Sequence, residues 1–149
     1  MPMRYDFWSN LLLMRKHYSQ SLEIPCQTWS MTRAEMDVLL FLSHHPDLDR
    51  AADIVEHRGL TKSHVSIAVK QLCERGFLET TQDVEDHRVI HLKPTDEAAE
   101  VIEAGKSFQR CYWQTLFDGF SDEELVQLRY LQEKLFDNLR NMGEQNEDL

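Results

Sequence analysis

The chain has 149 residues, of which 42% are hydrophobic, and this length suits one domain or a compact core with extra helices. Its net charge of −10 predicts that the molecule as a whole repels nucleic acid and anionic membranes, and no apolar run is long enough to span a bilayer. Its three cysteines are widely spaced without a CxxC pair, which favours a cytoplasmic setting over a disulfide framework or a zinc ribbon.

The chain begins with a predicted amphipathic helix over residues 5–22. Its apolar side chains lie three or four residues apart, at Phe7, Leu11, Met14, Tyr18 and Leu22. Pro25 is expected to end this helix and to leave a loop after it. Thr32 and Glu35 then form a T-x-x-E capping box in front of the apolar run 36–42, which predicts the start of a second helix.

A short third helix and a fourth helix are predicted next. Asp49 is expected to cap a helix over residues 50–58, which closes at Gly59. Thr61 is expected to cap a fourth helix that runs to Gly76.

The period then changes from helix to strand. Residues 77–82 and 88–93 read as short strands joined by an acidic turn, and a long helix is predicted from 95 to about 117. A short helix, a turn and a second helix followed by a hairpin is the winged helix-turn-helix pattern.

The last predicted helix begins with the SDEE sequence at 121–124, after a break at Gly119. Its apolar stripe consists of Leu125, Leu128, Leu131, Leu135, Leu139 and Met142. Isolated amphipathic helices need a partner surface, so a second copy of the chain is the expected partner. The predicted fold is therefore mainly α with a small β-hairpin wing: a winged helix-turn-helix core over 32–94, flanked by helical dimerisation regions over 5–22 and 95–142.

The helix that follows Thr61 carries two different faces. Val65, Ala68, Val69 and Leu72 are expected to point inward, and the opposite face is short-chained and polar, which suits a helix entering a DNA major groove. A solvated helix face is the plainer alternative. The candidate DNA-binding residues here are Thr61, Lys62, Ser63, His64, Ser66, Ile67 and Lys70.

The hairpin tip holds one arginine beside acidic residues. Asp86 and Arg88 lie two apart, so the carboxylate is expected to orient the guanidinium, and an arginine aimed in this way suits a narrow minor groove. The alternative is a surface ion pair without function. His87 is expected to be a polar group near DNA, while Asp83 and Glu85 oppose close approach to phosphate.

Residues 60–95 resemble the MarR family of bacterial winged-helix regulators. The matching stretches are LTKSHVS, ERGFLE, the D-x-R at 86–88 and HLKPT. The resemblance implies a homodimer, most simply a repressor, that binds a pseudo-palindromic operator in double-stranded DNA. It assigns Ser63, Ser66 and Lys70 to the recognition helix, and Arg88 with Asp86 to the wing. The sequence departs from the family at Glu97, where glycine is common, and in its acidic wing tip.

The acidic charge is unevenly distributed along the chain. Residues 58–93 hold six Lys or Arg and five Asp or Glu, a net of +1, whereas residues 94–149 sum to −8. Charge on a distant lobe is largely screened at physiological salt. We therefore expect DNA binding of modest affinity with a shallow salt dependence.

The sequence also allows sensing, which many members of this family perform. A pocket for a small aromatic or phenolic ligand is expected from the aromatic residues Trp8, Tyr18, Trp29, Tyr112 and Trp113. Redox sensing would use Cys26, expected to be the most exposed thiol in a loop, or Cys111. No metal-ligand spacing, nucleotide-binding glycine loop or catalytic triad stands out, so neither a metal, a cofactor nor an enzymatic activity is expected. The alternative functions are a winged-helix interaction module without DNA binding and a redox- or metal-sensing regulator.

Overall fold

A computed structural model describes residues 6–147 of the chain, with side chains up to residue 142. The chain divides into two compact units at residues 113 and 114. The first unit contains the winged helix-turn-helix core and the helices at its N-terminal side, and the second contains the last long helix. Along the described residues, no helix is both long enough and apolar enough to cross a membrane.

Helices α1 (Asp6–Ser21) and α2 (Glu23–Thr28) form the N-terminal part of the first unit. The prediction that Pro25 ends the first helix and precedes a loop is wrong, because the break comes three residues earlier and Pro25 lies within α2. Proline is tolerated in the first turn of a helix, where its missing N–H has no partner to lose. Pro25 and Leu22 are buried there, so α2 is anchored to the core.

Helix α3 (Arg33–His44) is the central helix of the core. The predicted capping box is confirmed: the Glu35 N–H donates to Thr32 Oγ1 at 3.2 Å, and the Thr32 N–H donates to Glu35 Oε2 at 2.6 Å. Seven residues of α3 are buried, from Glu35 through Leu42, so nearly its whole circumference is covered.

Helices α4 (Ala51–Arg58) and α5 (Lys62–Glu74) form the helix-turn-helix. The predicted cap of α5 is confirmed, since the His64 N–H donates to Thr61 Oγ1 at 3.1 Å. The predicted cap of α4 is wrong: Arg50 occupies the N-cap position, and its N–H donates to Asp53 Oδ2 at 3.0 Å. The Asp49 carboxylate does not cap the helix because it contacts His91 of the hairpin.

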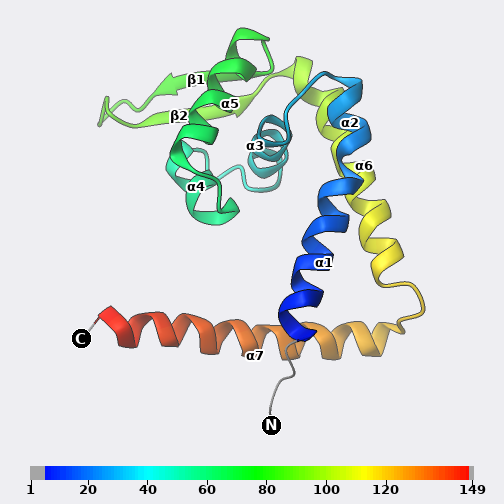
Figure 1. The fold of residues 1–149 in the computed structure, drawn as a ribbon. Coiled ribbons are helices and arrows are strands. Elements are labelled where there is room, and N and C mark those ends of the chain that lie inside the picture. Colours follow the sequence, from blue (N-terminus) through cyan, green and yellow to red (C-terminus); the bar gives the residue numbers. More distant parts are fainter. Residues whose placement is uncertain (1–5, 148–149) are drawn as a thin grey trace. The chain divides into compact units, whose positions relative to one another are not determined.

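The wing is a two-stranded antiparallel hairpin, β1 (Leu78–Gln82) with β2 (Ile90–Pro94), which extends from the end of α5 (Figure 1). Leu78 and Leu92 are buried and attach the hairpin to the core. The second strand begins two residues later than predicted, because the Val89 N–H donates to the Asp86 carbonyl at 2.9 Å and so belongs to the turn.

Gly76 joins α5 to the wing with φ +77°, a left-handed conformation that favours glycine. The Phe77 N–H donates to the Leu72 carbonyl at 2.9 Å, which completes the C-terminal cap of α5. The Gly76 carbonyl accepts from the Thr95 hydroxyl at 2.6 Å, and the Thr95 N–H donates to the Phe77 carbonyl at 3.1 Å. Both ends of the hairpin are therefore fastened to the end of α5.

The 3-10 helix η1 (Asp96–Ala98) leads into α6 (Ala99–Leu116), and α7 (Asp122–Glu147) follows. Within the first unit α6 packs on α3 at Gly105, which lies against Met36 and Leu40. It is also attached to α1, where the Tyr112 hydroxyl donates to the Met14 carbonyl at 3.1 Å. The predicted SDEE cap of α7 is confirmed, since the N–H of Ser121 donates to Glu124 Oε2 at 2.8 Å.

Candidate nucleic-acid interface

Helix α5 presents the two faces that its sequence predicts. Val65, Ala68 and Leu72 are buried and Val69 is half-buried, which confirms the inward face. All seven candidate DNA-binding residues from Thr61 to Lys70 are exposed, including the apolar Ile67, whose exposed fraction is 56%. The Lys70 ammonium lies 3.9 Å from the Glu74 carboxylate, and both side chains are exposed. Such an ion pair is weak, so a phosphate can take the place of the Glu74 carboxylate.

At the wing tip, Asp86 and Arg88 form the pair that their spacing predicts. Asp86 Oδ1 accepts from Arg88 Nε at 3.0 Å and Asp86 Oδ2 from Arg88 Nη2 at 3.2 Å, and the Arg88 backbone N–H also donates to Oδ1 at 3.0 Å. These bonds from Arg88, the side chain first, lower the pKa of the Asp86 carboxyl. The Arg88 side chain is nevertheless 91% exposed, so its direction is fixed while its surface stays available.

The turn that carries this pair is built around Asp83. Asp83 Oδ1 accepts the backbone N–H groups of Glu85 and Asp86, each at 2.9 Å. The Asp86 N–H, a bond from His91 and the Glu85 N–H together lower the pKa of Asp83 to about 2. Asp83 is thus engaged inside the hairpin, whereas Glu85 and His87 are exposed, with the His87 carbonyl accepting from Gln82 Nε2 at 3.3 Å.

His91 and Asp49 also belong to this site, although neither was predicted to be part of it. His91 Nδ1 lies 2.8 Å from Asp49 Oδ1, and His91 Nε2 lies 3.0 Å from Asp83 Oδ2. In the sequence, His91 lies in a predicted strand that follows an acidic turn, and this position could have indicated a contact with Asp83. Its second partner, 42 residues away in the chain, could not be found without the fold.

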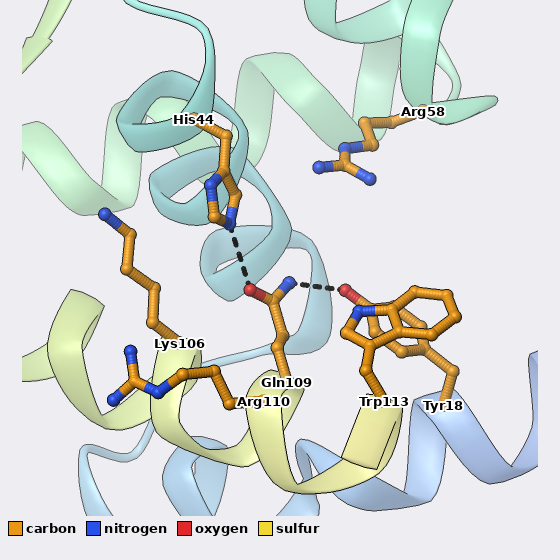
Figure 2. A pocket seen from close by; sticks show the side chains of 7 residues that line it. All are labelled: Tyr18, His44, Arg58, Lys106, Gln109, Arg110 and Trp113. Atoms are coloured by element: carbon orange, nitrogen blue, oxygen red, sulfur yellow. Dashed lines mark hydrogen bonds between the residues drawn. The ribbon is translucent and has the colours of Figure 1, made fainter. Parts of the chain in front are cut away.

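A separate cavity of about 360 Å³ lies between α1, α3, α4 and α6 of the first unit. The Gln109 side chain contacts two other lining residues (Figure 2). Gln109 Oε1 lies 3.0 Å from His44 Nε2, and Gln109 Nε2 donates to the Tyr18 hydroxyl at 2.5 Å. Three cations and one indole complete the lining: Arg58, Lys106, Arg110 and Trp113.

Two of the five predicted pocket aromatics line this cavity, namely Tyr18 and Trp113, whose ring centroids lie 6.2 Å apart. Tyr112 packs against Tyr18 at 5.4 Å without lining the cavity. Trp29 packs on the core, and Trp8 is 70% exposed beside Phe7. The polar and cationic lining was not predicted, because its residues come from three helices and form no sequence motif.

The cysteines are placed differently from the prediction. Cys26 lies in α2 and not in a loop, and it is half-buried, as is Cys73, whereas Cys111 on α6 is exposed. Burial is the largest cause that raises the pKa of both the Cys26 and the Cys73 thiol, which disfavours the reactive thiolate. Over the described residues no group of three or more His, Cys, Asp or Glu is placed to hold a metal ion.

Comparison with known proteins gives one family. Residues 29–89 match the model of the MarR family. Two curated relatives come from Bacillus subtilis (strain 168). The uncharacterized HTH-type transcriptional regulator YdgJ is 26% identical over 117 residues, which cover 78% of this chain and 70% of that protein. The HTH-type transcriptional repressor MdtR is 28% identical over 109 residues, covering 70% of this chain and 67% of that protein.

Solved structures show the same fold. The S. aureus MepR–DNA complex superposes with a TM-score of 0.69 at 22% identity, covering 92% of this chain and 96% of that one. Bordetella bronchiseptica BpsR, whose DNA binding is regulated by 6-hydroxynicotinic acid, gives 0.67 at 20% identity, covering 87% and 98%.

Proposed function

We propose that this chain, which belongs to the MarR family, is a dimeric, sequence-specific DNA-binding transcriptional repressor. Its recognition helix α5 enters the major groove of each operator half-site, and Arg88 of the wing enters the adjacent minor groove. The observation that carries the proposal is an exposed arginine held bidentately by Asp86 on a hairpin that follows α5 directly. We further propose that the protein acts in the cytoplasm and catalyses no reaction.

The outward face of α5 supports major-groove contacts. The hydroxyls of Ser63 and Ser66 are short enough to approach base edges or phosphates, and the exposed Ile67 can contact a thymine methyl. The first turn of α5 carries no acidic residue, so the partial positive charge of the helix N-terminus is open to a phosphate.

The wing supports a minor-groove contact for a different reason. A free arginine loses side-chain freedom when it enters a narrow groove, whereas the two hydrogen bonds from the Arg88 side chain to Asp86 already fix its direction. The guanidinium keeps a face for the strongly negative groove because it is 91% exposed.

Two helices support dimerisation. On α1 the side chains of Trp8 and Leu12 are 70% and 66% exposed in the single chain, and on α7 four members of the predicted stripe are 42–60% exposed: Leu131, Leu135, Leu139 and Met142. Burying one such side chain contributes roughly 1.5–3 kcal/mol. A soluble chain with this much exposed apolar surface needs a partner, and a second copy supplies the two half-site readers that a pseudo-palindrome requires.

The test starts from the duplex that the wild-type chain selects from a random-sequence library. Fluorescence anisotropy on this duplex should show Arg88→Ala weakening binding by about ten- to a hundredfold, as removal of a specific contact does. Arg140→Ala is the matched control, because Arg140 is also exposed and paired with an aspartate, Asp137, but lies on α7. Failure of the wild type to enrich any sequence, even at low salt, would favour a winged-helix interaction module instead.

We also propose that the cavity around Gln109 binds a small aromatic effector that carries an acidic group. Arg58, Lys106 and Arg110 supply positive charge, Trp113 and Tyr18 supply aromatic surface, and Gln109 and His44 supply hydrogen-bonding groups. Arg110 is paired with Glu103 at 2.7 Å, so the ligand has to compete with that carboxylate.

Calorimetry with 6-hydroxynicotinic acid, the regulator of BpsR, tests the cavity. Lys106→Ala should weaken binding about tenfold, as expected for one charge-assisted contact. Lys93→Ala is the control, since Lys93 is an exposed lysine on the wing. Equal affinities of the two variants would exclude this cavity as the site.

A further inference from the structure

His91 connects two carboxylates that belong to different parts of the winged domain. Asp49 precedes α4 of the helix-turn-helix, and Asp83 lies in the turn at the wing tip. The three side chains remain about one-third exposed, at 34%, 35% and 35% for Asp49, His91 and Asp83. Both ring nitrogens of His91 are engaged, so the imidazole fixes the distance between its two partners.

Each of the two aspartates also accepts a hydrogen bond from a backbone N–H group. The backbone carbonyl of Asp49 accepts the Leu92 N–H at 2.7 Å, so Asp49 is attached to two consecutive residues of β2. The other oxygen of Asp83 accepts the N–H of Asp86, whose own carboxylate holds Arg88. A continuous series of hydrogen bonds therefore runs from the segment before α4 to the wing arginine.

We propose that His91 is a positioning residue for Arg88, and that its protonated ring holds the wing arginine in the direction that DNA binding needs. This inference rests on the proposed function, and it adds a dependence on pH to that function. Loss of the proton should loosen the wing turn from Asp49 and lower DNA affinity without removing any group that contacts DNA.

The chemistry of the ring explains the dependence. An imidazolium has two N–H donors, one for each carboxylate, whereas a neutral imidazole has one donor and one acceptor. An ionised carboxylate only accepts. Deprotonation of His91 therefore turns one of its two bonds into a contact between a nitrogen lone pair and a carboxylate oxygen, which repel each other.

The charges around His91 favour the protonated ring. The bond to Asp49 and then the bond to Asp83 raise the pKa of His91 above its usual 6.5. On the cross-strand side its partner is the uncharged Thr81. Lys93 lines the same cavity of about 330 Å³, but its ammonium lies 3.6 Å from the Glu79 carboxylate, which offsets its charge.

The direction of the pH effect follows from these shifts. The His91 contribution is fully present below pH 6.5 and is lost as the pH rises through its raised pKa. The Asp83 contribution is present above 3.8, the usual pKa of an aspartate, and is lost as the pH falls towards about 2. The wing should be held most firmly in the interval between these limits.

The experiment measures the affinity of wild type and His91→Gln for the selected duplex across this pH range at constant ionic strength. The ratio of the two affinities should fall about three- to tenfold as the pH rises through the pKa of His91, the range expected for residues coupled in one network. All other residues near the proposed DNA interface are the same in both proteins, so the ratio isolates the effect of residue 91. His17→Gln, an exposed histidine on α1, is the matched control and should follow the wild type.

Asp49→Asn separates positioning from a general structural role. Removing one of the two carboxylates should move the midpoint of the affinity change to lower pH, a shift that simple loss of wing stability would not produce. A wild-type to His91→Gln ratio that stays constant with pH, or an unmoved midpoint in Asp49→Asn, would overturn the inference.

A second measurement uses the protein without DNA, so that it decides even where the wild type selects no sequence and the proposed function fails. NMR titration should show the Arg88 Nε–H signal changing with the same midpoint as the His91 ring. An Arg88 signal that is unaffected while His91 titrates would refute the positioning role.

Discussion

Gly105 lies where α6 packs closely against α3, so Gly105→Ala should disturb the protein more than its small size suggests. A methyl group added there would lie 2.9 Å from Leu40 Cδ2 and 3.0 Å from Met36 Sδ. Ordinary contacts between such atoms are about 3.5–4.0 Å. Leu40 and Met36 are 1% and 0% exposed, so neither side chain has solvent into which to move.

Two opposing effects set the magnitude. Alanine is favoured over glycine in a helix interior by about 1 kcal/mol. Overpacking a closed core costs about 1–3 kcal/mol, and both contacts involve side-chain ends that can shift slightly, so the lower half of that range applies. The free energy of unfolding should therefore fall by up to about 1 kcal/mol, which lowers the Tm of a chain of this size by at most roughly 2–4 °C.

Urea denaturation followed by circular dichroism measures this change, with Ser107→Ala as the control on the same helix. Ser107 is exposed, so its replacement changes helix propensity without crowding the core and should leave the protein equal or slightly more stable. In a Leu40→Val background, which removes the crowded methyl groups, Gly105→Ala should be less destabilising. An increase in stability of about 1 kcal/mol for Gly105→Ala alone would show that the packing at this point is loose.

Three further outcomes are expected. Thr32→Ala removes the hydroxyl that accepts the Glu35 N–H and so removes the side-chain cap of α3, whereas the Glu35 carboxylate keeps the backbone N–H of residue 32. Urea denaturation should show a loss of about 1 kcal/mol, and Thr28→Ala, at an exposed hydroxyl, should show much less. Leu131→Asp places a charge on the exposed apolar stripe of α7. Light scattering should give the chain mass of 17.6 kDa for the variant and twice that mass for the wild type. A variant that still has the dimer mass would place the interface elsewhere. Asp86→Asn removes an acid from the wing, so bulk electrostatics predicts tighter DNA binding, whereas loss of the bidentate bonds predicts about threefold weaker binding in anisotropy. Weaker binding would show that the direction of the arginine matters more than the local charge.

Local chemistry made most of the fold predictable. The caps at Thr32 and Thr61 and the SDEE sequence each contain both members of a hydrogen-bonded pair within three residues, so the sequence alone identifies them. The inward face of α5 follows from helical spacing, and the pair of Asp86 with Arg88 follows from a separation of two residues.

Features that depend on distant partners could not be predicted. Asp49 has the composition of a helix cap, but β2 brings His91 to it and Arg50 takes the cap position instead. The cavity around Gln109 collects residues from four helices, and none of its cations belongs to a recognisable motif. Pro25 suggested a break because the sequence does not show that a new helix begins at Glu23, which places the proline in the first turn, where it is tolerated.

The fastening of the hairpin at Gly76 and Thr95 has a consequence for how operators of this protein can change. Since both ends of the wing are bound to the end of α5, the offset between major-groove and minor-groove contacts within one half-site is a fixed property of the fold. Under the proposed function, replacing Ser63 or Ser66 should then alter which bases are preferred while this offset stays constant. The separation of the two half-sites is set by other parts of the dimer, so base preference and half-site spacing can evolve independently.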